Sequence, residues 1–419
     1  MRRAVNSTQT GAGELSARGP LEGVRVIDIS SSYAAPTTSM YLGDMGADVI
    51  KIEPPRRGDD ARSWGPPFVG EEAAWFLAVN RNKRSVCLDL RSQAGLAVLH
   101  RLLQSADVFI ENINPAKLGS RGLDPESITG RYPQIVYCAV SGFGLNGVEN
   151  GLPGYDLIAQ ARSGLMSVTG PAGGAPERVS TALSDIAAGT IAAFAVAAAL
   201  YRQQRTGRGD VVDVSLLEAA LSFMSPRVAS FLAGEAEPRP SGGTDSVLSV
   251  YQPFEAADRP IVVAVGNDDM WRRFCATVGL DGMADDPRFA TNALRRQHRQ
   301  EIIAVVRRKL KTRSAADWLD DFGSAQIPCA PIQYLSEVTL DPQIVDREAI
   351  VELEHPVAGR FQVVRQPWQL ASQNGVQAKA APVLGVDTVP VLREAGYAED
   401  EIAEMLDGGV AWSQPIVKS

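Results

Sequence analysis

Short apolar runs alternate with amphipathic stretches along the first half of the chain. Unbroken runs of β-branched and aliphatic residues are typical of strands that are buried on both faces of a sheet. They predict strands at 24–29, 48–52, 85–90, 107–111 and 134–140, with helices at 37–45 and 93–104. Strands that alternate with helices predict a parallel sheet, so the expected fold class is α/β, with a Rossmann-like, open, doubly wound sheet.

The pattern changes in the second half. An apolar run at 186–201, rich in Ala and Gly, predicts a helix that extends to residue 204. The run is shorter than the roughly 18 to 20 residues needed to span a membrane, which favours a buried helix packed closely on a neighbour. A strand at 211–214 and a helix at 216–232 follow. Two strands within 249–266 and helices at 270–278, 299–310 and 315–322 are less regular and predict a smaller α+β domain. Beyond it, the pattern predicts a hairpin at 351–364 and helices at 388–394 and 400–406.

These patterns also predict domain limits. Residues 1–19 are polar, lack the apolar core of a signal peptide and predict a disordered tail. Residues 20–205 form the first part of the large domain. The segment 206–245 contains a stretch rich in Pro, Gly and Glu and is interpreted as a linker, and the small domain occupies 246–342.

Composition narrows the classes of function. Lys plus Arg number 41 and Asp plus Glu 49, so the net charge is −8 and predicts no general attraction for nucleic acid or for anionic membranes. The four cysteines have neither metal-ligand spacing nor the arrangement of a disulfide framework, which predicts a reduced, cytoplasmic protein. The three histidines are too few and too scattered to predict a zinc site.

A glycine-rich segment at 142–147 matches G-x-G-x-x-G and follows a predicted strand. A dinucleotide-binding fingerprint also needs a helix that begins at the motif, but the residues after it, 149–154, predict a loop. The segment is therefore interpreted as a loop in which glycines permit turns or a close approach to a ligand.

Asp185 begins the apolar helix and allows two interpretations. It can be the N-cap, which accepts hydrogen bonds from backbone N–H groups and complements the helix dipole. It can also be a partly desolvated carboxylate that acts as a nucleophile or base. The residue types alone leave both open.

Two further clusters carry polar side chains near predicted strand ends. Residues 80–85 and Arg91 form a basic cluster, which suits either a phosphate-bearing ligand or a solvated run of charges. Tyr155 and Asp156 follow a Pro-Gly turn, where the tyrosine either orients a ligand or is structural.

Several ordered segments together identify a family. They are 20–28, 46–54, 80–85, 111–112, 154–166, 185–189, 206–209, 266–268 and 286–292. Through them, over about residues 20–410, the chain resembles the class III CoA-transferases, the family of formyl-CoA and carnitine CoA-transferases that also contains α-methylacyl-CoA racemases. Residues 62–68 further resemble the branch that uses succinyl-CoA and dicarboxylate acceptors, the glutarate type.

The resemblance assigns roles to residues. Asp185 occupies the position of the catalytic aspartate, which forms an anhydride with the acyl group and then a thioester with CoA. Coenzyme A is a substrate, and the resemblance implies neither a metal nor a redox cofactor. The positions that contact CoA by resemblance are Tyr33, Ala34, Leu88, Arg91, Asn112, Ile113, Asn114, Tyr155 and Asp156. Many members have a basic residue where this chain has Asn114, and some have one at Ser120, so we hypothesise that Lys117 supplies the missing charge.

Tyr155 discriminates between activities. The racemases have a histidine at this place as one of two acid/base groups, and a tyrosine with a pKa near 10 is a poor substitute. CoA transfer is therefore favoured over racemisation. An acyl-CoA hydrolase is a further alternative, and the aspartate at 185 argues against a CoA-binding protein without activity.

The resemblance also implies the architecture and the partners. Residues 343–419 return to the large domain, and two subunits interlock as a homodimer. The expected partners are an acyl-CoA and a free carboxylic acid, with no nucleic acid and no membrane. A loop at 241–244 is a candidate lid. Arg62, Arg178 and Arg227 are candidates for binding a distal carboxylate, although the structural interpretation is favoured for each of these arginines.

Overall fold

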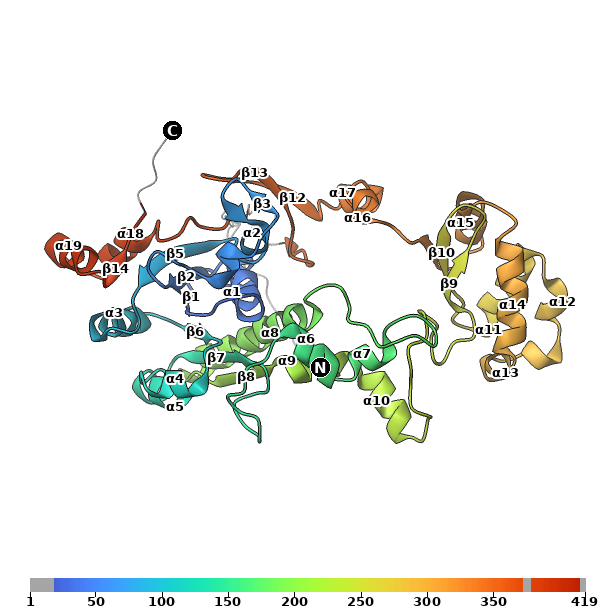
Figure 1. Cartoon of the computed structure of the whole chain (residues 1–419), viewed down its shortest axis with the longest axis horizontal. Coiled ribbons are helices and arrows are strands. Elements are labelled where there is room, and N and C mark those ends of the chain that lie inside the picture. Colours follow the sequence, from blue (N-terminus) through green and yellow to red (C-terminus); the bar gives the residue numbers. More distant parts are fainter. Residues whose placement is uncertain (1–18, 372–377, 415–419) are drawn as a thin grey trace, which may run out of the picture. The chain divides into compact units, whose positions relative to one another are not determined.

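The computed structural model describes residues 19–371 and 378–414, which fall into two compact units (Figure 1). The first unit is built from the chain up to residue 163, from 181–223 and from residue 347 onward. The second unit contains 164–180 and 224–346. Residues 164–180, which the sequence assigned to the large domain, thus belong to the second unit. The predicted tail lies outside the described residues except for Gly19.

A seven-stranded sheet forms the centre of the first unit. Its order is β14–β5–β2–β1–β6–β7–β8, with β14 antiparallel to its neighbour and the other strands parallel. The predicted doubly wound α/β sheet is confirmed. The strands are β1 (Arg25–Asp28), β2 (Asp48–Glu53), β5 (Lys83–Leu88), β6 (Val108–Glu111), β7 (Val136–Ser141), β8 (Val211–Ser215) and β14 (Ala411–Trp412).

Helices cover both faces of this sheet, which explains the unbroken apolar runs of the strands. One core contains side chains of α1 (Ala34–Asp44), α6 (Asp156–Arg162), α8 (Leu183–Thr206) and α9 (Leu216–Phe223). The other contains side chains of α3 (Gln93–Leu103), α4 (Pro115–Gly119), α5 (Pro125–Arg131), α18 (Thr388–Glu394) and α19 (Glu399–Asp407).

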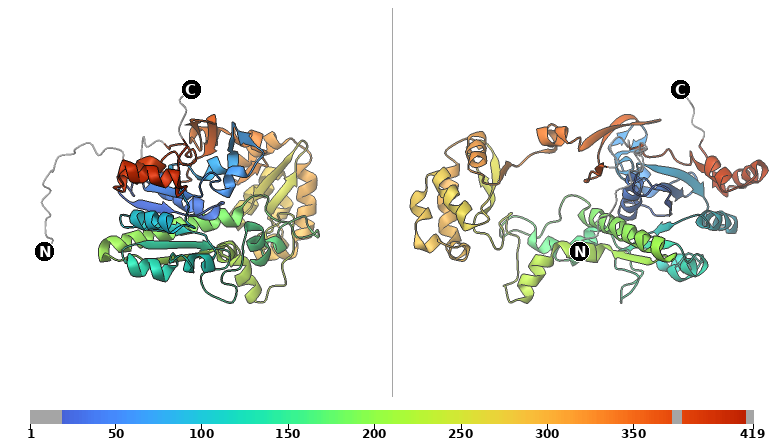
Figure 2. Two further views of the ribbon diagram at one scale, coloured as in Figure 1. Left: turned by 60° about the vertical axis from the view of Figure 1, so that its left-hand side comes forward. Right: turned by 180° about the vertical axis from the view of Figure 1, so that it is seen from behind.

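The helix α8 packs closely against α1 (Figures 1 and 2). A Cβ atom at Gly189 would lie 2.6 Å from the carbonyl oxygen of Ala34, so only glycine permits this approach. By length and composition alone α8 could cross a membrane, but half of its most apolar stretch is buried inside the protein. Its contacts with α1, β7, β8 and α9 identify it as a core helix, as the sequence predicted.

Some predicted helix limits are wrong. The helix predicted at 216–232 is two helices, α9 and α10 (Ser225–Leu232), because Pro226 lacks a backbone N–H and begins a new helix. The first helix begins at Ala34 rather than at residue 37, since a proline at position 36 is tolerated in a first helical turn.

The second unit has a three-stranded antiparallel sheet, β11–β10–β9, packed with helices around its own apolar core. This matches the α+β pattern predicted there. The elements are α7 (Leu165–Val168), α10, β9 (Tyr251–Glu255), β10 (Pro260–Ala264), α11 (Asp268–Val278), α12 (Asp281–Ala284), η2 (Pro287–Phe289), α13 (Asn292–Gln297), α14 (Arg299–Leu310), α15 (Ala315–Ser324), β11 (Cys329–Pro331), α16 (Leu335–Val338) and α17 (Pro342–Asp346).

Two small hairpins complete the first unit. The predicted hairpin is formed by β12 (Ile350–His355) and β13 (Gly359–Val364). Another joins β3 (Phe68–Val69) and β4 (Glu72–Ala73), which lie between η1 (Asp60–Ser63) and α2 (Ala74–Val79).

Candidate active site

A cavity of about 290 Å³ lies where the strand order of the large sheet reverses. The chain runs outward in both directions from the neighbouring strands β1 and β6, and ligands of open α/β sheets bind in the crevice at such a switch point. The segments after these two strands form part of its wall. The lining includes Ser31, Ser32, Tyr33, Ala34, Asp60, Trp64, Asn112, Ile113, Asn114, Gly142, Phe143, Tyr155 and Asp185.

The loops after β1 and β6 are joined by two hydrogen bonds. The backbone N–H of Ser31 donates to Oδ1 of Asn112 at 3.0 Å, and Nδ2 of Asn112 donates to the carbonyl oxygen of Ser31 at 2.7 Å. Asn112 therefore fixes the two loops relative to each other. Its amide has an oxygen that accepts and an NH₂ group that donates, so it can bind both the N–H and the carbonyl oxygen of Ser31.

Asp185 is the third residue of α8, because the helix begins at Leu183 with Ala182 as its N-cap. The interpretation of Asp185 as the N-cap is thus wrong. Asp156 caps the helix instead: its Oδ1 accepts the backbone N–H of Ser184 at 2.8 Å. Within residues 19–371 and 378–414, the side chain of Asp185 has no hydrogen bond and no ion pair, and it faces the cavity half-buried.

The surroundings of Asp185 disfavour its charged form. Burial, together with the nearby carboxylate of Asp156, raises the pKa of Asp185 to about 7. The phenol of Tyr33 lies close enough to feel this charge: burial first, then Tyr41 and Asp185, raises the pKa of Tyr33. At neutral pH a substantial fraction of Asp185 is ionised, and the ionised carboxylate is poorly solvated and therefore reactive.

A second unusual carboxyl lies at the end of β6. Glu111 is buried, and its Oε2 accepts the backbone N–H of Ile113 at 2.7 Å. Burial raises the pKa of Glu111 to about 7. The residue does not line the cavity but holds the backbone of Ile113, which does.

The structure brings seven of the ten predicted site residues together on this cavity. They are Tyr33, Ala34, Asn112, Ile113, Asn114, Tyr155 and Asp185. Asn114 also caps α4, since its Oδ1 accepts the N–H of Ala116 at 3.0 Å. Asp156 does not line the cavity but binds the N-terminus of α8.

Leu88 and Arg91 are not part of the cavity lining. Leu88 is buried at the end of β5, where it pairs with Ala411 of β14. Arg91 is exposed, and its guanidinium pairs with Asp89 at 2.9 Å. Lys117 is exposed on α4, outside the lining. The roles of these three residues toward CoA stay predictions.

Sequence reasoning missed several lining residues, among them Ser31, Ser32, Trp64 and Phe143. A signal for three of them was available. Ser31 and Ser32 follow β1, and Phe143 follows β7, so all three come just after the carboxyl end of a parallel strand. The place of Trp64 depends on the η1 turn, which carries no comparable signal.

The basic cluster at 80–85 is neither a solvated run nor a site open to a ligand. Arg81 is buried and pairs with Asp44 at 2.6 Å, and the buried Lys83 donates to the carbonyl oxygen of Pro36 at 2.8 Å. Arg84 pairs with Glu394 at 2.6 Å. The cluster holds secondary-structure elements together because its charges are matched within the fold.

Arg62 is also paired within the fold. Its guanidinium makes a bidentate contact with Glu53, with both N–O distances at 2.8 Å, so it is not free to bind a substrate carboxylate. The loop at 241–244 and Arg227 belong to the second unit, where they line a groove together. In the part of the chain that the structure describes, no three His, Cys, Asp or Glu side chains gather as metal ligands.

A sequence model described as CoA-transferase family III matches residues 21–388. The chain belongs to CoA-transferase family III. Succinyl-CoA:glutarate CoA-transferase of Homo sapiens is 36% identical over 392 residues, which are 93% of this chain and 90% of the relative. Succinate–glutarate CoA-transferase of Agrobacterium fabrum is 36% identical over 381 residues, 90% of this chain and 95% of the relative. These matches confirm the resemblance inferred from the sequence.

Solved structures support the same assignment. A CaiB/BaiF family protein from Brucella suis superposes with a TM-score of 0.78 at 31% sequence identity. The match covers 90% of this chain and 100% of that protein. The fold of this family III CoA-transferase is therefore shared with its relatives over nearly its whole length.

Proposed function

We propose that the protein transfers CoA from succinyl-CoA to a free dicarboxylic acid, with Asp185 as the nucleophile. The observation that carries the proposal is the half-buried carboxylate of Asp185, which faces a cavity at the switch point of the sheet and has a pKa raised to about 7. The choice of donor and acceptor rests on relatives whose names specify succinyl-CoA and glutarate.

The proposed reaction proceeds through two kinds of covalent intermediate on Asp185. An oxygen of Asp185 attacks the thioester carbonyl of succinyl-CoA, which forms a mixed anhydride and releases CoA as a thiolate. The thiolate attacks the aspartyl carbonyl, which forms an aspartyl-CoA thioester and releases succinate. The acceptor carboxylate then attacks the carbonyl of this thioester, which forms the second anhydride and releases CoA again as a thiolate. The thiolate finally attacks the acceptor carbonyl, which gives the new acyl-CoA and regenerates Asp185.

The geometry suits these steps in two ways. Asp185 lies in the first turn of α8, whose backbone dipole favours negative charge on the oxyanions that form beside it. Tyr33, Trp64 and Phe143 contribute aromatic surface to the cavity lining. Exclusion of water protects both intermediates from hydrolysis.

The test is mass spectrometry of CoA esters after the protein is mixed with succinyl-CoA and one free acid. Glutarate, itaconate, mesaconate, malate and oxalate are tried in turn. A new acyl-CoA with stoichiometric release of succinate is expected with at least one dicarboxylate. Free CoA without a new ester would indicate a hydrolase, and scrambled stereochemistry of an α-methylacyl-CoA would indicate a racemase.

An isotope experiment tests the covalent route itself. When the acceptor acid carries heavy oxygen in its carboxylate, the mechanism leaves one of these oxygens on Asp185, which passes it to succinate in the next cycle. Heavy oxygen in the released succinate is expected. Its absence, while the new acyl-CoA still forms, would contradict the aspartyl anhydride.

We further propose that the protein is a cytoplasmic homodimer. The helices α6, α8 and α9 contact one another and expose large apolar side chains, of which Phe194 is 76% exposed and Phe223 51%. Such a surface suits a second copy of the chain. The four cysteines are free, which suits a reducing compartment. Light scattering at micromolar concentration tests the dimer, and a monomeric mass would contradict it.

A further inference from the structure

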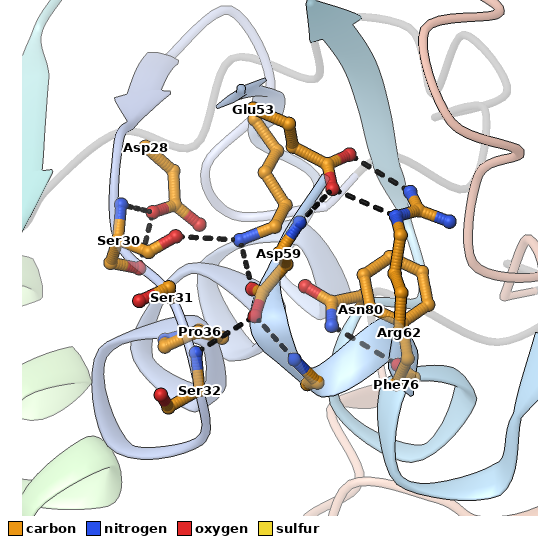
Figure 3. A network of polar contacts seen from close by, with 12 residues as sticks. Asp28, Ser30, Ser31, Ser32, Pro36, Glu53, Asp59, Arg62, Phe76 and Asn80 are labelled. Carbon is orange, nitrogen blue, oxygen red and sulfur yellow. Dashed lines mark hydrogen bonds and ion pairs between the residues drawn. The ribbon is translucent and has the colours of Figure 1, made fainter. Parts of the chain in front are cut away.

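A network of buried charges adjoins the loop that carries Ser31 and Ser32 (Figure 3). The side chains of Lys51 and Asp59 are fully buried, and Nζ of the lysine lies 2.8 Å from Oδ2 of the aspartate. Removing such charges from water is costly, so the pair is weak evidence for a stabilising role. Its contacts indicate another role.

Asp59 uses both carboxylate oxygens. Oδ1 accepts the backbone N–H of Ser32 and that of Ala61, each at 2.9 Å, while Oδ2 faces Lys51. Lys51 also donates to the carbonyl oxygen of Ser30 at 2.8 Å. The ion pair therefore holds the loop on both sides of Ser31.

Ser32 has a backbone conformation that needs such support. Its φ angle is +74°, in the left-handed region that a residue with a side chain rarely adopts. Strain of this kind persists only where surrounding contacts hold it, and it is concentrated at functional sites. The next residue, Tyr33, begins α1 as its N-cap and lines the cavity with Asp185.

We infer that Asp59 and Lys51 are positioning residues for the CoA-transfer site, which hold the strained backbone at Ser32 and thereby place Tyr33 in the cavity. The inference rests on the proposed function. Neither Asp59 nor Lys51 lines the cavity, so both act through the loop.

The substitution Asp59→Asn separates this role from simple packing. An asparagine has the same shape but one acceptor oxygen, and its NH₂ group must face either the ammonium of Lys51 or the N–H groups of Ser32 and Ala61. One anchor is lost whichever way the amide turns. The double substitution Lys51→Met with Asp59→Asn removes this conflict, because the amide oxygen can face Ser32 while its NH₂ group faces the thioether.

A matched control exists at the other end of α1. Asp44 and Arg81 form an equally buried ion pair, with side chains 1% and 3% exposed, and neither lines the cavity. Asp44→Asn therefore breaks a comparable pair without touching the loop. Thermal melting gives the Tm of the wild type and of the three variants. CoA affinity by calorimetry, and kcat and KM for succinyl-CoA, are then measured well below each Tm.

Both single variants are expected to melt earlier than the wild type. Only Asp59→Asn is expected to weaken CoA binding and raise KM, by about tenfold or more, since small misplacements of a binding group have effects of this order. The double variant is expected to recover part of this loss, because the contact of residue 59 with Ser32 returns while the hydrogen bond from Lys51 to Ser30 stays lost. Unchanged binding and KM in Asp59→Asn would overturn the positioning role, as would equal defects in Asp44→Asn or a double variant with wild-type Tm and no recovery.

The same measurements separate this inference from the proposed function. A wild type that binds CoA without transferring it would overturn the function, while the CoA affinities of the variants still decide the positioning role. A wild type that neither binds CoA nor transfers it would overturn both.

Discussion

Carboxylates in the first unit differ in whether a cation or another carboxylate lies next to them. Glu53 and Asp59 lie against Arg62 and Lys51 at 2.8 Å in each pair. Asp185 has Asp156 as its charged neighbour, and in the described residues no cation pairs with it. Burial would raise the pKa of Glu53, but Arg62 and Lys51 hold it at about 2, whereas Asp185 rises to about 7.

The comparison shows which buried acids maintain the fold and which are left reactive. A paired carboxylate is fixed in charge and geometry, so it can anchor a loop but is a poor nucleophile. An unpaired, partly desolvated carboxylate destabilises the fold when it ionises, and the same property makes it reactive. Cleft geometry alone does not make this distinction.

The sharpest test of the comparison is Asp185→Asn. The variant is expected to lose CoA transfer by about 1,000-fold or more, because an amide cannot form the anhydride. Formation of the new acyl-CoA, followed by mass spectrometry, measures this loss. Asp210→Asn is the control, since Asp210 is exposed beyond the other end of α8 and pairs with Arg202. Retained transfer in Asp185→Asn would end the proposed mechanism.

The same variant should be more stable than the wild type. The pKa of Asp185 is raised above its usual value of 3.8, so the folded state is favoured below about pH 4 and loses this advantage as pH rises through about 7. Asparagine removes the cost of ionisation. A higher Tm for Asp185→Asn above pH 7, with little difference near pH 4, is expected from calorimetry.

Among the paired carboxylates, Arg62→Met should lower the stability of the fold, whereas Asp185→Asn raises it. It leaves Glu53 buried without its partner, which is expected to cost about 3–5 kcal/mol of unfolding free energy. Denaturant titration measures this loss, and transfer per folded molecule should fall less than in Asp185→Asn. Arg202→Met, which breaks an exposed pair, is the control and should hardly change the midpoint. A small loss in Arg62→Met would show that the buried pair is no stronger than a surface pair.

The pH dependence sharpens the comparison further. Because Asp185 attacks in its ionised form and its pKa is about 7, kcat/KM should rise with pH and level off above about 7. Stopped assays with succinyl-CoA across this range measure the profile, and circular dichroism at each pH checks that the protein stays folded. A flat profile down to pH 5 would place the pKa of the nucleophile near that of an ordinary carboxyl.

The smallest expected effect is that of Asp156→Asn. Removing the neighbouring negative charge should shift the midpoint of the kcat/KM profile to lower pH, since Asp156 is the second cause of the raised pKa after burial. The amide oxygen can still accept the N–H of Ser184 and cap α8. Asp210→Asn should leave the midpoint in place. An unmoved midpoint in Asp156→Asn would attribute the raised pKa to burial alone.

Much of the fold could be predicted because the buried strands of a parallel sheet consist of unbroken runs of β-branched residues. The strands β1, β2, β6 and β7 follow directly from that rule. Helix limits were less predictable. Pro226 divides one predicted helix, and the predicted N-cap at Asp185 is displaced because α8 begins at Leu183, three residues before the predicted start at 186. Short helices such as α4 and α6 lack enough residues to show a helical period.

The sequence by itself determined the family, the parallel sheet and seven of the residues that line the cavity, because these depend on local apolar patterns and on motifs that follow strand ends. Only the tertiary structure decided which charges are neutralised. The basic residues at 80–85 are matched by partners such as Asp44 and Glu394, which are distant in the sequence. Asp185 received a carboxylate as its neighbour instead of a cation. Charge pairing across the sheet depends on side chains brought together from remote segments, and no local pattern encodes it.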